Sequence, residues 1–133
     1  MRVFVDTNVF LDVVLRRDGF EESLIVLNAI EKGIFEGVVL DITMLNIDYV
    51  AKKQVANIRE FLRFVNGVFE VAGASNDMIR EALEMDGKDL EDNLQCICAK
   101  KSACEVLISN DKEFIASSIP TLSSVEFVKA HID

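Results

Sequence analysis

The sequence of 133 residues contains no tryptophan, one proline and one histidine, and its six glycines are scattered. These counts exclude collagen-like, proline-rich and low-complexity chains. The single histidine, His131, lies near the C-terminal end, and the glycines form no phosphate-binding loop, so neither a Ser–His–Asp triad nor a P-loop is available. No apolar run reaches the roughly 18 to 20 residues of a membrane span, so we expect no membrane partner.

Cysteine is almost as scarce. Cys96, Cys98 and Cys104 are an odd number, which cannot pair completely within one chain, and the first two lack the Cys-x-x-Cys spacing of zinc and redox sites. We interpret them as small buried thiols, which suit a reducing cytosol. Asp6 places an acid where a signal peptide would continue its apolar stretch. We therefore expect a soluble cytoplasmic protein with a single domain over residues 1–133.

Positive charge is also in short supply. Fourteen Lys and Arg residues stand against 23 Asp and Glu residues, which gives a net charge of −9. A protein that holds nucleic acid through charge alone should be basic, so a nucleic-acid partner would require cations or local basic contacts. Most basic residues are interpreted as solvated helix faces. The candidates for contact with an RNA backbone are Arg16, Arg17, Lys52 and Lys112.

The sequence does contain a regular alternation of short apolar runs and helical patterns, and half of its residues are hydrophobic, enough for a core. The apolar runs predict five strands, at residues 2–5, 37–42, 68–71, 106–108 and 121–122. Helices are predicted between them, with Thr43 as one cap, Asn66-Gly67 as one end, and a capping box from Ser123 to Glu126. This order predicts an α/β fold, a three-layer α/β/α sandwich with a central parallel sheet.

Acidic residues lie at the carboxyl ends of the predicted strands, where such sheets carry their functional groups. Asp6 directly follows the first strand and Asp111 follows the fourth, while Asp89, Glu91 and Asp92 begin the helix that leads into the fourth. If the first and fourth strands are neighbours, these carboxylates converge, which is electrostatically costly unless a cation lies among them. Oxygen ligands favour Mg²⁺ or Mn²⁺ over zinc, and such an ion can direct water against a phosphodiester.

Each acid alone also has a structural explanation. Asp6 is suited to cap a helix, Asp89 and Asp92 to begin one, and Asp111 to form a turn. Asp12, about two helical turns beyond Asp6, is interpreted as a solvated residue, with a supporting role left open. Only the convergence of three acids at one sheet edge indicates a site.

Three segments carry a resemblance to a known family: Val3–Asp12, Asp89–Asn93 and Ile108–Phe114. In these motifs, and in the order of its elements over nearly the whole chain, the sequence resembles the PIN-domain family, which includes the VapC-type ribonuclease toxins. The resemblance implies a metal-dependent endoribonuclease that is often half of a toxin–antitoxin pair and often dimeric. An antitoxin protein and a second copy of the chain are therefore expected as partners, beside an RNA substrate.

The resemblance also implies roles for single residues. Asp6, Asp92 and Asp111 match the catalytic and metal-binding acids of the family, and Ser109 matches the hydroxyl residue that supports the site. Asp89, in the same motif as Asp92, is a further supporting candidate. Mg²⁺ or Mn²⁺ is the cofactor that this acid set implies.

The sequence departs from the family pattern at one position. The family usually places a glutamate on the helix after the second strand, and the matching position here is Asn46. Asparagine can bind an ion through its carbonyl oxygen but carries no charge. Asp48 lies two residues further on, which turns it away from Asn46 on a helix. Both residues are supporting candidates, and the departure puts metal affinity and turnover in question.

Two functions from different classes follow. The first is a divalent-metal-dependent endoribonuclease that hydrolyses RNA phosphodiester bonds, with a role as the toxin of a toxin–antitoxin pair as a further expectation. The alternative is a catalytically weak PIN scaffold that binds a protein or an RNA. A phosphoacceptor signalling domain is disfavoured, because a single acid follows the first strand and the third strand ends in Ala72-Gly73-Ala74.

Overall fold

The centre of the molecule is a parallel sheet of five strands in the order β3-β2-β1-β4-β5. The computed structural model describes residues 1–87, 89–114 and 118–133. The strands are β1 (Arg2–Val5), β2 (Glu36–Leu40), β3 (Glu70–Ala72), β4 (Val106–Ile108) and β5 (Thr121–Leu122). The chain builds outward from β1 through β2 to β3 and then returns to the other side of β1 with β4, so the strand order switches between β1 and β4.

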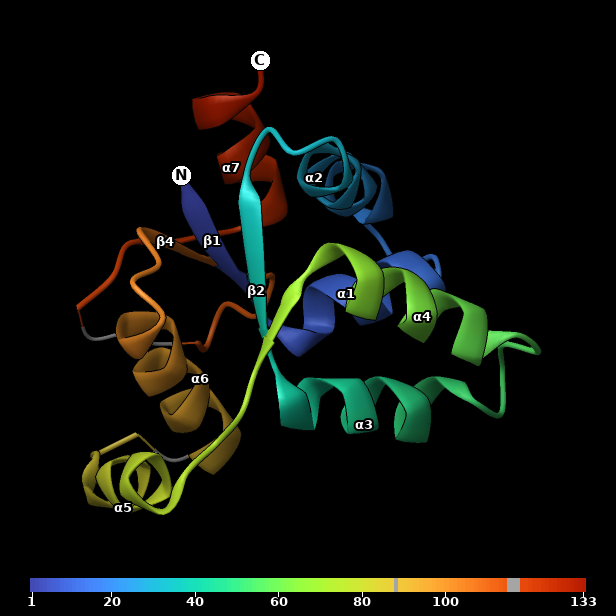
Figure 1. Cartoon of the computed structure of the whole chain (residues 1–133). Coiled ribbons are helices and arrows are strands. Elements are labelled where there is room, and N and C mark those ends of the chain that lie inside the picture. Colours follow the sequence, from blue (N-terminus) through green and yellow to red (C-terminus); the bar gives the residue numbers. More distant parts are fainter. Residues whose placement is uncertain (88, 115–117) are drawn as a thin grey trace.

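Helices cover both faces of the sheet, as Figure 1 shows. The described helices are α1 (Thr7–Val14), α2 (Phe20–Glu31), α3 (Asp41–Ala51), α4 (Ile58–Val68), α5 (Asn76–Glu84), α6 (Leu90–Lys101) and α7 (Ser124–His131). The pair α5 and α6 lies on one face, and the other five helices lie on the opposite face. The predicted three-layer α/β/α sandwich with a central parallel sheet is therefore confirmed.

Alternation along the strands divides the core in two. Val3 and Val5 of β1 belong to one apolar cluster, with residues of α1, α2, α4 and α7, whereas Phe4 between them belongs to the second cluster, with residues of α5 and α6. All three side chains are fully buried. This is why the central strands β1 and β4 contain the short, continuous apolar runs Val3–Val5 and Val106–Ile108 rather than alternating patterns.

The predicted boundaries around α3 and α4 were wrong in detail. The second strand was expected to reach Ile42, but β2 ends at Leu40 and α3 begins at Asp41, so Thr43 lies inside the helix instead of capping it. Asn66-Gly67 does not end α4, which continues to Val68. A helical glycine costs only about 1 kcal/mol, and the complete burial of Val65 on this helix outweighs that cost.

Two smaller expectations, the capping box and the buried cysteines, are confirmed. Ser123 and Glu126 form a reciprocal capping box at the start of α7. All three cysteines are buried, and burial raises the pKa of the Cys104 thiol to about 11. Within the described residues, no helix is both long and apolar enough to cross a lipid bilayer.

Candidate functional site

The carboxyl ends of β1 and β4 lie side by side, which is the arrangement that the acid cluster required. Val5 pairs with Ile108 in the register of the two strands, and the backbone N–H of Asp6 donates to the carbonyl of Ile108 at 2.9 Å. The chain leaves β1 into α1 and leaves β4 into the segment that begins with Ser109. The end of the sheet at this switch point therefore brings two of the predicted acidic segments together.

Asp6 is held as a carboxylate with a fixed orientation. It occupies the N-cap position of α1, but its side chain makes no capping hydrogen bond. Instead its Oδ2 accepts from the hydroxyl of Ser109 and its Oδ1 accepts from the amide of Gln95, both at 2.7 Å. Burial raises the pKa of Asp6 to about 6, although these two hydrogen bonds act in the opposite direction. The Asp6 side chain therefore does not cap the helix, so the structural explanation offered for this acid was wrong.

Gln95 is a site residue that the sequence analysis missed. It lies on α6, is fully buried, and uses its Nε2 to hold Asp6. Its Oε1 has no hydrogen-bond partner among the described residues. The available signal was its spacing, because Gln95 lies three residues after Asp92 and therefore on the same side of the helix.

Asp92 lies in the first turn of α6, three residues after Asp89, which is the N-cap of this helix. The carboxylate of Asp89 caps the helix by accepting from the backbone N–H of Asp92 at 3.0 Å, as the structural explanation for Asp89 expected. Burial, together with the negative charges of Asp89, Asp6, Asp111 and Glu91, raises the pKa of Asp92 to about 7. The negative charges of the other two predicted acids, Asp6 and Asp111, therefore act on Asp92.

Asp111 is exposed and lies in the segment that follows β4. Its backbone N–H donates to the Ser109 hydroxyl at 3.1 Å, and its Oδ1 accepts from the backbone of Glu113 at 2.9 Å, which closes a turn. Asp92 and Asp111 line one hollow of about 360 Å³, together with Asp86, Gly87, Asp89, Asn93 and Glu113. Ser109 connects Asp6 with Asp111, because its hydroxyl donates to the Asp6 carboxylate and accepts from the backbone N–H of Asp111.

The three predicted acids are neighbours but not a finished set of ligands. In the part of the chain that the structure describes, no group of three or more His, Cys, Asp and Glu side chains is arranged to hold a metal ion. The donor set nevertheless fits a divalent ion. Its carboxylates are hard oxygen ligands whose mutual repulsion a cation would relieve, and the unpartnered Oε1 of Gln95 adjoins the most buried acid.

The supporting candidates on α3 differ in their positions. Asn46 points to the site, where its Nδ2 donates to Oε1 of Glu91 at 2.8 Å. The other oxygen of that carboxylate accepts from the hydroxyl of Thr7 at 2.8 Å. Asp48 lies about 200° further around the helix, and among the described residues no hydrogen bond or ion pair joins its side chain to these acids.

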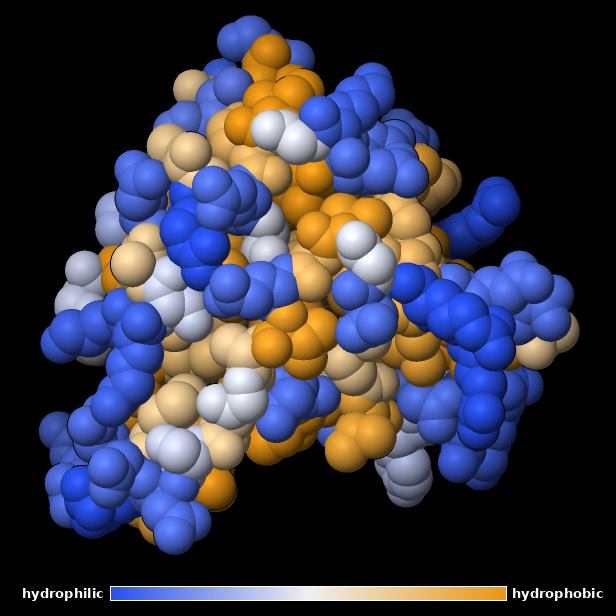
Figure 2. Space-filling model, viewed as in Figure 1, coloured by the Kyte–Doolittle hydropathy of each residue, from blue (hydrophilic) through white to orange (hydrophobic). Residues whose placement is uncertain are grey.

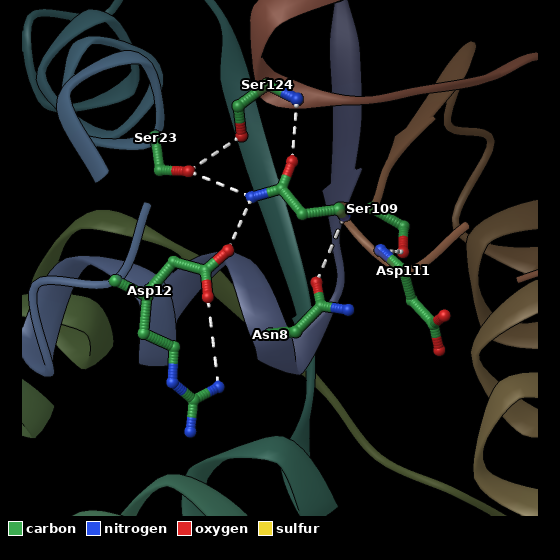
Figure 3. Close-up of polar contacts among 8 residues, drawn as sticks. Asn8, Asp12, Ser23, Ser109, Asp111 and Ser124 are labelled. Atoms are coloured by element: carbon green, nitrogen blue, oxygen red, sulfur yellow. Dashed lines mark hydrogen bonds and ion pairs between the residues drawn. The ribbon is translucent and has the colours of Figure 1, made fainter. Parts of the chain in front are cut away.

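Asn110 is a second residue that the sequence analysis missed, and Figure 3 labels the residues that it contacts, Asn8, Asp12, Ser23 and Ser124. Its Nδ2 donates to Asp12 Oδ2 at 2.9 Å and to Ser23 Oγ at 3.0 Å, and its Oδ1 accepts from the backbone of Ser124 at 2.9 Å. Its own backbone N–H donates to Asn8. Asp12, expected to be solvated, is in fact buried because Asn110 binds it. These contacts fix the segment that carries Ser109 and Asp111.

The candidates for RNA contact are exposed, and two of them have contacts of their own. Arg17 approaches Asp12 at 3.8 Å, and Lys52 lies over the ring of Tyr49. Arg16 and Lys112 are exposed. Their contact with RNA stays a prediction.

Comparison with known proteins agrees with the motifs. A family model described as PIN domain matches residues 2–113. Ribonuclease VapC1 of Aquifex aeolicus (strain VF5) is 31% identical over 137 residues, which cover 95% of this chain and 92% of that protein.

Two solved structures show how similar the fold is. VapBC2 from Rickettsia felis, bound to a DNA fragment from its promoter, is 16% identical with a TM-score of 0.66, covering 91% of this chain and 97% of that chain. PAE2754 from Pyrobaculum aerophilum is 17% identical with a TM-score of 0.68, and the match covers 100% of this chain and 91% of that chain. The motifs, the fold and the match of the family model over most of the sequence lead to one conclusion: this chain belongs to the PIN-domain family.

Proposed function

We propose that this chain is a divalent-metal-dependent endoribonuclease that hydrolyses phosphodiester bonds in RNA. The observation that carries the proposal is the fixed carboxylate of Asp6, held by Ser109 and Gln95 beside Asp92 and Asp111 at the switch point of the sheet. The name of its relative, ribonuclease VapC1, supports the same activity.

In this proposal Asp6, Asp92 and Asp111 hold Mg²⁺ or Mn²⁺. When bound, the ion supplies a lowered pKa for attacking water and neutralises charge that develops on the phosphate. Ser109 and Gln95 donate to Asp6 and keep both of its oxygens in place, so that the carboxylate does not have to reorient during the reaction. These neutral donors add no positive charge that would compete with the cation.

The test is cleavage of a panel of single-stranded and structured RNAs with Mn²⁺, with chelator, and with the variant Asp6→Asn. We expect cleavage only with the ion, and a loss on the order of 100-fold or more in the variant, because the metal contributes several kcal/mol to the transition state. Asp133→Asn, which removes the same charge at the exposed end of the chain, is the matched control. Cleavage that survives both chelator and Asp6→Asn would contradict the proposal.

A scaffold with little catalytic power is the second candidate, and Asn46 favours it. Its amide donates to Glu91 and contributes no negative charge to the site. The variant Asn46→Glu distinguishes the two functions. A silent parent chain that gains strong metal-dependent cleavage on this change would be the scaffold, whereas a parent chain that already cleaves RNA well would be the enzyme.

The endoribonuclease acts in this proposal as the toxin of a toxin–antitoxin pair. The relative is a VapC protein, and the similar structure from Rickettsia felis is a VapBC pair. An apolar groove of about 260 Å³ adjoins the site and offers a surface for a protein partner; its lining residues are Ile42, Ile79, Ala82, Leu90, Glu91 and Leu94. Figure 2 shows apolar patches among the hydrophilic side chains on one face of the molecule.

Growth after induction in a bacterial host tests the toxin role. We expect arrest with the wild-type chain and normal growth with Asp6→Asn, because toxicity requires cleavage. Equal growth with both chains, at matched protein levels, would leave the ribonuclease without a toxin role.

A further inference from the structure

The sequence analysis placed Glu91 among the converging acids but gave it no role, and the structure shows how its side chain is held. It lies in the first turn of α6, directly before Asp92, and both of its carboxylate oxygens are held. Oε2 accepts from the hydroxyl of Thr7, the residue after Asp6, and Oε1 accepts from the amide of Asn46, each at 2.8 Å. Thr7 is itself fixed by a 2.8 Å hydrogen bond to Thr43. Three helices therefore aim one carboxylate at the acid cluster.

The negative charge of Glu91 acts on the cluster and is not neutralised there. Glu91 lies directly before Asp92 in α6, and its hydrogen-bond donor Thr7 directly follows Asp6, so it is close to both acids. Thr7 and Asn46 are neutral donors, and no basic side chain of the described residues forms an ion pair with Glu91. A partly buried carboxylate held without a counter-charge is costly, and a cation in front of it would remove that cost.

A separate observation points to the same place. The amide of Gln95 is completely buried against Asp6, yet its Oε1 has no hydrogen-bond partner among the described residues. A buried carbonyl oxygen without a donor is destabilising, because it has lost its hydrogen bonds to water and gained none. Because the same amide holds Asp6, a polar ligand bound at Asp6 would supply a donor beside this oxygen, so the orphaned atom favours a ligand at the acids over packing alone.

We propose that Glu91 is the additional carboxylate of this metal site, with Asn46 and Thr7 as the residues that position it. This inference rests on the proposed function. Each oxygen of Glu91 retains a lone pair after its hydrogen bond, so the carboxylate can accept from the water molecules of the ion while it supplies charge. Mg²⁺ usually retains several waters and binds few carboxylates directly, which suits this arrangement. Asn46 is then not a lost acid but the donor that aims a neighbouring one.

The affinity for Mn²⁺ alone, measured by isothermal titration calorimetry on the full chain, tests this role without relying on activity. Glu91→Gln should weaken binding about 10-fold, because residues that act around the direct ligands typically change affinity by about 10- to 100-fold. The matched control is Glu60→Gln, which removes an exposed glutamate from the first turn of α4 and should leave affinity unchanged. The double variant Asn46→Glu/Glu91→Gln exchanges the donor and the acceptor of the hydrogen bond between these two residues. It keeps one carboxylate at this position and should therefore restore most of the Mn²⁺ affinity.

Thermal unfolding in chelator separates this role from a structural one. A purely structural Glu91 would lower the unfolding temperature of Glu91→Gln without changing Mn²⁺ affinity in the folded protein, which would overturn the inference. If that variant does not fold, a folded Asn46→Glu/Glu91→Gln chain with wild-type affinity supports the inference, and one with weakened affinity overturns it. If Glu91→Gln binds Mn²⁺ as tightly as Glu60→Gln does, and the wild-type chain binds Mn²⁺ and cleaves RNA, only the role of Glu91 is contradicted. A wild-type chain that neither binds nor cleaves would remove the proposed function and this inference with it.

Discussion

At the scale of single residues, Asp6 shows what a buried carboxylate costs the folded chain. Its side chain is 4% exposed, and burial holds its pKa near 6 instead of 3.8. Between these two values the folded chain binds more protons than the unfolded chain. The free energy of unfolding therefore falls as the pH rises from about 4 to above 6, and the full cost of the charge is present at neutral pH.

Asp6→Asn should accordingly stabilise the metal-free protein. The substitution removes the buried charge and retains the contacts, because Asn Oδ1 can accept from Gln95 while Nδ2 donates to the Ser109 hydroxyl. We expect a gain of about 2 to 3 kcal/mol at pH 7.5 that shrinks to near zero at pH 4. Urea unfolding in chelator at the two pH values measures it, and a variant less stable than wild type at pH 7.5 would contradict the prediction.

At the scale of elements, Asn110 connects the end of β4 to three helices. Its side chain contacts Asp12 of α1, Ser23 of α2 and Ser124 of α7, all of them buried. Asn110→Ala would leave these groups with unmet hydrogen bonds, so we expect a loss of about 2 to 4 kcal/mol. Asn66→Ala, on the exposed side of α4, is the control and should be neutral or slightly stabilising. Equal stability of the two variants by urea unfolding would contradict the connecting role.

The same scale explains what the sequence could and could not predict. Strands such as Val106–Ile108 were located correctly because a strand buried on both faces is a continuous apolar run. Asp6 and Asp111 could be placed at one end of the sheet because they follow β1 and β4. The end of α4 was not, because the burial of Val65 overrides the weak preference of glycine against helix.

The missed site residues share a physical reason. Gln95 and Asn110 are neutral side chains whose roles depend on partners far away in the sequence, Asp6 for one and Ser23 for the other. No local pattern encodes such partners, since a buried amide and a solvated amide have the same chemistry until the fold brings a neighbour to them. The hydrogen bond between Asn46 and Glu91 belongs to the same class.

At the scale of the whole molecule, a net charge of −9 makes any cation stabilising to some degree, because screening relieves the repulsion among the acids. A built site differs from this background in two ways. Its effect saturates with concentration, and it depends on particular residues. Binding also joins elements far apart in the sequence, since the proposed ligands come from the end of β1, the start of α6 and the segment after β4.

Mn²⁺ at about 100 times its dissociation constant should therefore raise the unfolding temperature by roughly 10 °C, since binding to the folded state alone contributes about 2.7 kcal/mol under that condition. Differential scanning calorimetry measures the shift, with NaCl at equal ionic strength as the control for screening. Asp6→Asn should lose most of the shift, although it is the more stable chain without metal. The prediction is contradicted if Mn²⁺ shifts wild type and Asp6→Asn equally, and NaCl produces the same shift. The acids would then respond only to ionic strength, and no ion would have a defined place among them.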